Sequence, residues 1–452
     1  MSRHLLRPLR PSVSPLIAAA ATVLCGLAGA SAQANELFFN LNKNYTEGTP
    51  SLFLFGDAGT SVSVSNGNSF SQSFSLDSTG FFNLALPPVQ STAGTGISDK
   101  GFVVSSSGSI GAYLVNRAPY TSDMAYLYDS KGLGTQYLLA SQGGGNGEGS
   151  QVGITATQDN TIVTLTPKSG AAVTVTLNKG QTYTYAGGSV DLTGSRVSAN
   201  KPIAVLSGHQ CANVPIGTGY CDTLVEQMPS IDRLSKRYVV SETTNTGSAG
   251  NLVRVISPTD GNQIKVGGVV VATLNAGQVH EFTLQDAAVI EGSAPVMVAQ
   301  YLKGQDATFP DVSDPSMAVI GGSDTWLDAY RLATPTGKQA FAFNYANIVI
   351  DASAEDSLQL NGADVDTSSF ADVAGTTLRF GSIRVSGLFS LNAKQKFQLV
   401  LAGFDSYDTY MTTGGTSFAP GASPTPQVPE PSDYALLASG LVTLLIARRR
   451  LH

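Results

Sequence analysis

Charged side chains are scarce in this sequence. Asp, Glu, Lys and Arg make up 13% of its 452 residues, about half the share usual in soluble domains, and the net charge is −7. Long surface helices and coiled coils depend on Glu, Lys and Arg, so this composition excludes an architecture of that kind. The acidic balance also argues against nucleic acid as a partner, because phosphate binding needs clustered Lys and Arg.

Cysteine and histidine are also rare, with three and four residues. One cysteine lies in an export-like leader, which leaves Cys211 and Cys221 in the body of the chain. In an oxidising compartment the default interpretation of such a pair is one disulfide that closes a small loop. The competing interpretation is a metal or nucleophile site in which His209, Asp222 and Glu226 join the cysteines.

The sequence lacks the motifs of common hydrolases. Neither G-x-S-x-G nor H-E-x-x-H occurs, and no pair of carboxylates stands in a recognisable catalytic frame. The glycine-rich stretch at 143–149 lacks the Lys-Ser/Thr that completes a phosphate-binding loop. We therefore expect a protein that is not an enzyme and needs no cofactor. A secreted hydrolase of polysaccharide or protein is the alternative.

An export signal is present at the start of the chain. Basic residues precede an apolar run from Leu16 to Leu27, and small residues around Ala32 and Ala34 form an A-x-A cleavage site. We predict a secretory signal peptide over residues 1–34 and export through the Sec translocon. Cleavage is expected after Ala34, with Ala32 as the other candidate site.

Between the two ends, the residue pattern is that of β-strands. Glycine is abundant, with 48 residues, and aliphatic residues alternate with Ser and Thr in short runs separated by turn-forming residues. Two stretches, 175–185 and 272–282, both read T-L-N-x-G-Q followed by an aromatic residue. Each is followed by a buried strand that is expected to begin at a proline, Pro202 or Pro295.

These repeats predict an all-β fold of tandem sandwich-like units, because strands with one apolar face must pair face to face. We expect units of roughly 50–60 residues that occur about four times. The first unit covers 35–117, the two clearest repeats lie near 159–208 and 250–304, and a further unit covers 336–412. A propeller or a solenoid of repeats is the alternative arrangement.

A set of longer motifs lies in the region 118–335. They are QYLLAS, ATQDNTIVTLTP, LNKGQTY, DLTGSRVSANKPIAVLSGHQCANVP, VAQYLKG and DPSMAVI. Together they resemble the N-terminal domain of the IgGFc-binding protein family. The resemblance implies that Cys211 and Cys221 form a disulfide and that the chain is a surface protein. It does not imply immunoglobulin binding, since no residue of this chain can be assigned to that contact.

The end of the chain has several parts in a fixed order. A Pro/Gly/Ser linker at 413–427 is followed by Val428, Pro429, Glu430 and Pro431, by a short apolar run, and by Arg448, Arg449 and Arg450. The apolar run is too short to span a bilayer comfortably, since a spanning helix needs about 20 residues. The arrangement over 428–452 resembles the bacterial PEP-CTERM sorting signal. That resemblance implies recognition by an exosortase, a transient transmembrane helix in the inner membrane, and delivery to the cell surface. An ordinary C-terminal anchor is the alternative.

Two groups of side chains are candidate binding residues. Asp306, Asp311 and Asp314 lie in one loop, and an oxygen-rich loop of this kind is a candidate calcium site. Tyrosines gather in the links between the repeats, at Tyr120, Tyr126, Tyr128, Tyr137 and Tyr220. Aromatic-rich loops form binding surfaces in many proteins, or else pack over sheet edges, and the sequence does not decide between the two.

The predicted function is adhesion or binding outside the cell. We expect a protein of the outer surface or of the extracellular biofilm matrix whose partner is an extracellular polysaccharide or a surface protein. The other candidates are the secreted hydrolase and a structural sheath component that self-assembles.

Overall fold

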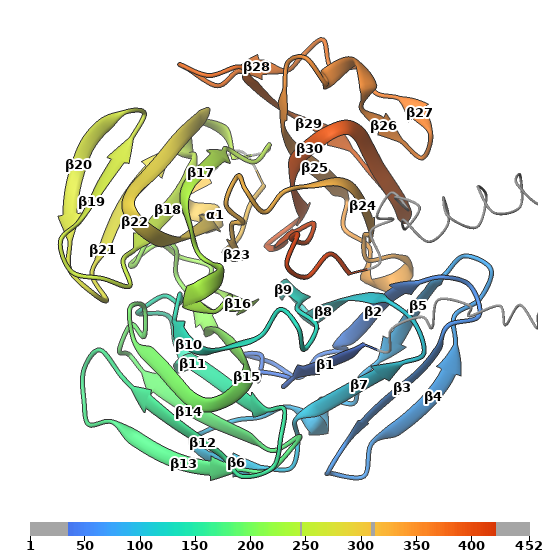
Figure 1. Cartoon of the computed structure of the whole chain (residues 1–452), viewed down its shortest axis with the longest axis vertical. Coiled ribbons are helices and arrows are strands. Elements are labelled where there is room, and N and C mark those ends of the chain that lie inside the picture. The colour runs from blue at the N-terminus through green and yellow to red at the C-terminus, as the bar shows by residue number, and fades with distance from the viewer. Residues whose placement is uncertain (1–34, 245, 309–311, 422–452) are drawn as a thin grey trace, which may run out of the picture. The chain divides into compact units, whose positions relative to one another are not determined.

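The computed structural model describes residues 35–244, 246–308 and 312–421. Almost all of the regular structure in these residues is β-strand, arranged in tandem sandwich-like units as the sequence predicts (Figure 1). The predicted secretory signal and the predicted sorting signal lie outside the described residues. Within the described ranges, no helix has the length and apolarity that a membrane span requires.

Four repeats of strands follow one another along the chain. The strands of the first repeat are β1 Glu36–Phe39, β2 Ser51–Gly56, β3 Ser61–Asn66, β4 Ser71–Ser75, β5 Phe81–Ala85, β7 Phe102–Ser106, β8 Ile110–Ala118 and β9 Thr121–Leu127. The short strand β6 Gly96–Ser98 lies between β5 and β7 in the sequence but pairs with a strand of the second repeat. Those of the second are β10 Gly134–Leu138, β11 Asn146–Ala156, β12 Thr161–Thr166, β13 Val173–Leu177, β14 Thr182–Gly188, β15 Arg196–Ala212 and β16 Asp222–Gln227.

The third repeat contains β17 Ser235–Ser241, β18 Asn251–Ile256, β19 Asn262–Val266, β20 Val269–Leu274, β21 Val279–Leu284, β22 Ala287–Leu302 and β23 Ser316–Val319. The fourth contains β24 Leu327–Ala333, β25 Phe343–Asp351, β26 Gln359–Leu360, β27 Ala363–Asp364, β28 Ala371–Asp372, β29 Leu378–Arg384, β30 Leu388–Asp405 and β31 Asp408–Thr413. Short helical turns connect some strands: η1 Pro88–Gln90, η2 Ile231–Arg233, η3 Gly247–Ala249, α1 Gln305–Thr308, η4 Gly337–Gln339 and η5 Glu355–Ser357.

Each of the last three repeats is organised around one long strand whose two parts pair with different neighbours. In the second repeat the first part of β15 pairs with β10 and β12, and its second part pairs with β11 and β16. β22 and β30 take the same position in the third and fourth repeats. In the first repeat a break at residues 107–109 divides the strand into β7 and β8, and each part joins its own sheet.

The pairing of each long strand contains an irregular step, at which its neighbours change. Pairing of β15 with β10 skips from Ser198 to Ile203, and β22 and β30 contain the same kind of step against β17 and β24. Pro202 and Pro295 lie at these steps, inside the strands, so the prediction that they start strands is wrong. Proline is tolerated at an irregularity of this kind, where the ladder does not require its missing amide.

At each irregular step of a long strand, a buried tyrosine forms hydrogen bonds to the backbone. The Tyr137 hydroxyl donates to the Ile203 carbonyl at 2.6 Å and accepts from the Gly134 amide at 2.8 Å. Tyr238 makes the same pair of hydrogen bonds in the third repeat, and Tyr330 makes it in the fourth. Because one arrangement recurs in three repeats, these tyrosines are structural residues, and Tyr137 is not part of a binding surface.

The T-L-N-x-G-Q motif forms the same turn in both repeats that contain it. The Asn178 amide donates to the Gln181 side-chain oxygen, and the Gln181 amide donates back to the Asn178 carbonyl, both at 2.9 Å. Asn275 and Gln278 make the equivalent pair of bonds. The motif therefore joins β13 to β14 and β20 to β21.

The repeats are longer than the sequence predicted. The second runs from Gly134 to Gln227 and the third from Ser235 to Val319. The predicted segments 159–208 and 250–304 lie inside these ranges. They omit β10, β11 and β16 of the second repeat and β17 and β23 of the third, because those strands carry no motif that the repeats share.

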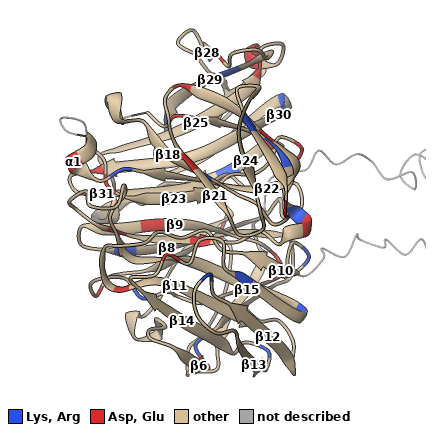
Figure 2. Ribbon diagram, turned by 90° about the vertical axis from the view of Figure 1, so that its left-hand side faces the viewer, with Lys and Arg blue, Asp and Glu red and all other residues tan. Residues whose placement is uncertain are grey.

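Apolar side chains pack between the paired sheets and also across repeat boundaries. One core joins Ile154 and Val205 of the second repeat to Leu252 and Tyr301 of the third. Neighbouring repeats therefore stabilise each other, as stacked repeats do in general. Charged residues occupy only short, scattered stretches of the ribbon (Figure 2).

The last strands of the four repeats, β9, β16, β23 and β31, contact one another at the centre (Figure 1). Asp123 of β9 is fully buried there. Its carboxylate accepts the amides of Val225 at 3.0 Å, Met317 at 3.1 Å and Met411 at 3.3 Å, one from each of the other three central strands. A single carboxylate thus connects all four repeats.

Candidate binding site

The two cysteines of the body are joined. Cys211, near the end of β15, and Cys221, just before β16, form a disulfide with Cα atoms 5.0 Å apart, which confirms the disulfide prediction. Disulfide sulfurs provide no thiolate, so the competing metal and nucleophile interpretations are wrong. In the described part of the chain, no group of three His, Cys, Asp or Glu residues is placed to hold a metal ion.

His209 and Glu226 are buried members of the strands that flank this loop. The Nδ1 atom of His209 accepts the Cys211 amide at 2.9 Å, and burial lowers the pKa of the imidazole to about 4. Burial raises the pKa of the Glu226 carboxyl well above its ordinary value. Neither side chain reaches the surface, so neither is placed for acid–base chemistry on a bound substrate.

The three candidate calcium ligands are only partly described. Asp306 is exposed on α1, and Asp314 is buried shortly before β23. Asp311 lies outside the described residues. A calcium site in this loop stays a prediction.

Three of the connections that lead into the central strands carry an exposed tyrosine shortly before the central strand begins. Tyr120 precedes β9, Tyr220 lies shortly before β16, and Tyr407 precedes β31. All three have a left-handed backbone, with φ of 59°, 61° and 57°. This conformation costs a non-glycine residue about 1–2 kcal/mol. The side chains are 69%, 51% and 41% exposed. Exposed rings held in an unfavourable conformation are typical of functional positions.

These tyrosines converge at one end of the central strands. The ring centroids of Tyr220 and Tyr407 lie 4.8 Å apart. Tyr120 and Tyr220 line a common pocket of about 450 Å³. Its other walls include Tyr45, the amide side chains of Asn146 and Asn213, and the disulfide.

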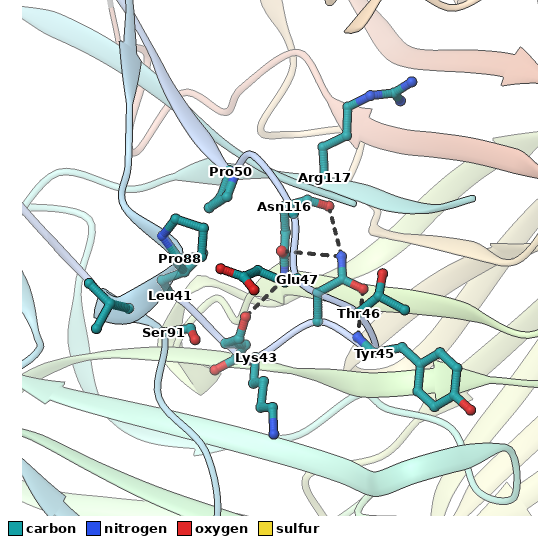
Figure 3. A pocket seen from close by; sticks show the side chains of 14 residues that line it. Leu41, Lys43, Tyr45, Thr46, Glu47, Pro50, Pro88, Ser91, Asn116 and Arg117 are labelled. Carbon is teal, nitrogen blue, oxygen red and sulfur yellow. Dashed lines mark hydrogen bonds between the residues drawn. The ribbon is translucent and has the colours of Figure 1, made fainter. Parts of the chain in front are cut away.

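A second pocket of about 390 Å³ adjoins the first through Tyr45 and Thr46. Its walls come mainly from the loop at 41–50 and from the end of β8. Figure 3 shows the Glu47 carboxylate on the side of Pro88, whereas the Tyr45 ring points to the opposite side. The two pockets together are called the tyrosine groove below.

Asparagine side chains hold the loop beneath Tyr45. The Nδ2 atom of Asn44 donates to the Asn116 side-chain oxygen at 3.3 Å and to the Thr121 carbonyl at 3.0 Å, and its Oδ1 atom accepts the Tyr45 amide at 2.6 Å. Asn116 in turn donates to the Asn42 carbonyl at 3.0 Å. A loop fixed in this way gives a groove that is formed before a ligand binds.

The sequence identified part of this surface. The tyrosines of the links divide into two groups: Tyr120 and Tyr220 are exposed, and Tyr126 and Tyr128 are buried. The sequence analysis missed Tyr407. A signal was available, because Tyr220 and Tyr407 are each followed within two positions by Asp-Thr at the start of a central strand.

The fold is a set of all-β repeats with a groove at the surface, and comparison with known proteins shows which family has this sequence. A family model described as IgGFc binding protein matches residues 123–403, and the chain belongs to this family. The match begins at the central carboxylate of Asp123 and extends into β30, beyond the region that the sequence motifs indicated.

A similar protein in Homo sapiens is named IgGFc-binding protein. It is 25% identical to this chain over 315 residues, which is 65% of this chain and 6% of the human protein. The chain therefore spans only a small part of the length of this relative.

Proposed function

We propose that this chain is an exported bacterial surface or matrix protein that acts by adhesion, with the tyrosine groove as its ligand-binding surface. The observation that carries the proposal is the convergence of Tyr45, Tyr120 and Tyr220, from separate loops, on one pocket. Core packing does not explain this convergence, because the three side chains are 47%, 69% and 51% exposed.

The chemistry of the groove suits a polysaccharide or a protein segment. Tyrosine rings provide flat apolar faces with a polar edge, and the amides of Asn146 and Asn213 both donate and accept hydrogen bonds. Few, well-placed polar groups among aromatic rings are typical of ligand sites. A glycoside hydrolase is not proposed, because Glu47 is the only carboxylate among the described residues that line the two pockets, and glycoside hydrolysis requires a pair.

An array of glycans and peptides tests the binding surface. The purified chain is compared with Tyr120→Ala and Tyr220→Ala, and with Ile162→Ala as a control that removes an equally exposed side chain from β12. We expect array binding that falls about tenfold in both tyrosine variants, as hot-spot aromatic residues do. Equal binding by the wild type and both tyrosine variants would show that the groove is not the site.

Sorting is the second part of the proposal. We propose removal of residues 1–34 during Sec export and exosortase processing at Val428–Pro431, with Arg448, Arg449 and Arg450 retained on the cytoplasmic side until then. Mass spectrometry of the protein recovered from the cell surface tests this step. Peptides that end near Pro431 support processing, and intact 434–452 in surface material contradicts it.

A further inference from the structure

Beneath one end of the tyrosine groove lie three buried carboxyl groups. Asp222, Asp314 and Asp408 are 0%, 1% and 4% exposed. Each has one side-chain oxygen without a hydrogen-bond partner among the described residues. Two hydroxyls beside Asp314, those of Ser313 and Ser316, are buried and equally unpartnered in the described structure. Buried polar atoms are satisfied in most proteins, so such a concentration of exceptions marks a site.

When these carboxyl groups are ionised, little positive charge balances them. Arg117 pairs with Asp408 at 3.1 Å, and the arginine is itself largely buried. Asp306 adds a further carboxylate at the surface. A Cβ atom on Gly219 would lie 2.2 Å from the Asp306 Oδ2 atom, so this carboxylate sits directly against the backbone next to Tyr220.

The exposed tyrosines cover the same end of the molecule. Tyr407 directly precedes Asp408, and its ring faces that of Tyr220. The hydroxyl of Thr409 donates to the Asp314 carbonyl at 2.5 Å, which connects the β31 hairpin to the loop that carries α1. Figure 2 shows α1 and β31 on the same, left-hand side. Aromatic faces and carboxylates therefore stand together.

We propose that Tyr220, Tyr407 and Asp306 bind a cationic side chain, the ammonium of lysine or the guanidinium of arginine, presented by a protein ligand. This inference rests on the proposed function of the tyrosine groove. Aromatic faces attract a cation placed within about 6 Å of the ring centroid, and the attraction is about 0.5–1 kcal/mol at exposed sites. The buried carboxyl groups, once they ionise, add a field that salt screens less than it screens surface charge.

The same charges disfavour a polysaccharide at this position. A neutral sugar would leave the exposed Asp306 carboxylate without a counter-charge, and an acidic polysaccharide would be repelled by it. A basic segment of a protein satisfies both the rings and the acids.

Binding of a cation here is expected to release protons. Burial, and then repulsion by Asp408, raises the pKa of Asp314 to about 8, and burial raises that of Asp408 to about 7 against the opposing effect of Arg117. The charged and titratable groups that face this pair are Asp123, Asp222, Asp306, Asp405 and Arg117. A bound cation favours the ionised carboxylates, so affinity rises with pH from 6.0 to 8.5.

Isothermal titration of the purified chain with tetralysine tests the inference. We expect binding that is at least about fivefold tighter at pH 8.5 than at pH 6.0 and that weakens at 0.5 M salt. Asp306→Asn and Tyr407→Ala are expected to weaken it about three- to fivefold, while Tyr407→Phe keeps the ring and the affinity. Circular dichroism of each variant establishes that it is folded.

Asp57→Asn is the matched control, because Asp57 is an exposed acid in the turn after β2. Gly56 pairs with Ile110 at the start of β8, and Tyr120 follows the end of β8, so a whole strand separates the control from the site. Tetralysine binding that survives Asp306→Asn and Tyr407→Ala, or that the control weakens equally, overturns the proposal.

Two sugar probes separate this inference from the proposed function. Neutral chitotriose that binds in place of tetralysine overturns the cationic ligand but leaves the groove as a binding site. Deacetylated chitotriose that binds more tightly than tetralysine overturns the protein as the source of the cation. The proposed function fails separately if Tyr120→Ala and Tyr220→Ala leave all array binding unchanged.

Discussion

The four connections into the central strands differ in length, although the strands they join pair in the same way. In the first and fourth repeats, two-residue turns connect β8 to β9 and β30 to β31, and the second residue of each turn is a tyrosine. In the second and third repeats, long loops connect β15 to β16 and β22 to β23, and these loops carry the disulfide and α1.

The comparison shows that the tyrosines of one surface are held in place in two different ways. At Tyr120 and Tyr407, turn geometry and the paired strands fix the tyrosine. At Tyr220, the chain between the strands is too long to be fixed by pairing alone, and the disulfide restricts it. All of these positions depend on the central strands that Asp123 connects.

The largest effect is expected from removing the common centre. Asp123→Ala leaves four buried amides without an acceptor, from Met124, Val225, Met317 and Met411. An unsatisfied buried donor costs about 1–3 kcal/mol, so we expect a loss of at least about 3 kcal/mol in the free energy of unfolding. Urea denaturation measures it, with Asp57→Ala as a control. A loss below about 1 kcal/mol would mean that the centre does not depend on this carboxylate.

Removal of the disulfide is expected to affect the long loop between β15 and β16 but not the two-residue turns. Replacing Cys211 and Cys221 by serine is expected to lower stability by about 2–3 kcal/mol, since the unfolded chain gains freedom. Amide hydrogen exchange is expected to accelerate in residues 213–220 and to stay unchanged at Tyr120. If exchange accelerates equally in residues 213–220 and at Tyr120, the disulfide does not act on the long loop alone, and this account is contradicted.

The buried carboxyl groups predict an unusual pH dependence. Asp314 and Asp408 have raised pKa values, about 8 and about 7, so the folded state holds protons that the unfolded state has released. Stability is therefore lost as the pH rises from 6.5 to 8, a window above the titration of unfolded histidine. Urea midpoints at several pH values measure this loss. Asp314→Asn should flatten the profile, and a midpoint that rises with pH in this window would refute the assignment.

The smallest effect is expected at the turns themselves. Tyr120→Gly removes the steric cost of a φ of 59°, so we expect stability to change by less than about 1 kcal/mol, in the favourable direction. Urea denaturation measures this change alongside array binding. If Tyr120→Gly gains stability but loses array binding, the tyrosine is retained for its ligand. A clear loss of stability in this variant would mean that Tyr120 serves packing instead.

The fold class and the disulfide could be predicted from the sequence because their signals are local. Alternating residues reveal strands, and Asn178 and Gln181 act within one turn. The central bundle could not be predicted in this way. Asp123 lies within β9 like any strand residue, and its partners Val225, Met317 and Met411 come from three distant strands. A single aspartate gives no periodic signal.

The candidate site was partly predictable for the same reason. The aromatic loops around Tyr120 and Tyr220 stood out by composition, while Tyr45 and Tyr407 did not. The convergence of these tyrosines depends on how the four repeats pack together, and a sequence pattern within one repeat carries no information about that packing. The shared structural role of Tyr137, Tyr238 and Tyr330 was not predicted, because their hydrogen-bond partners are backbone atoms, which leave no trace in side-chain identity.

Hydrogen exchange with the strongest binder from the glycan and peptide array tests the central claim most directly. The account predicts new protection at the loops beside Tyr45, Tyr120 and Tyr220, with no change in the edge strand β20, which exposes Val269 and Val270 on the outside of the third repeat. Protection confined to β20 or to another outer edge, with the tyrosine loops unaffected, would contradict the claim that these hairpins form the binding surface.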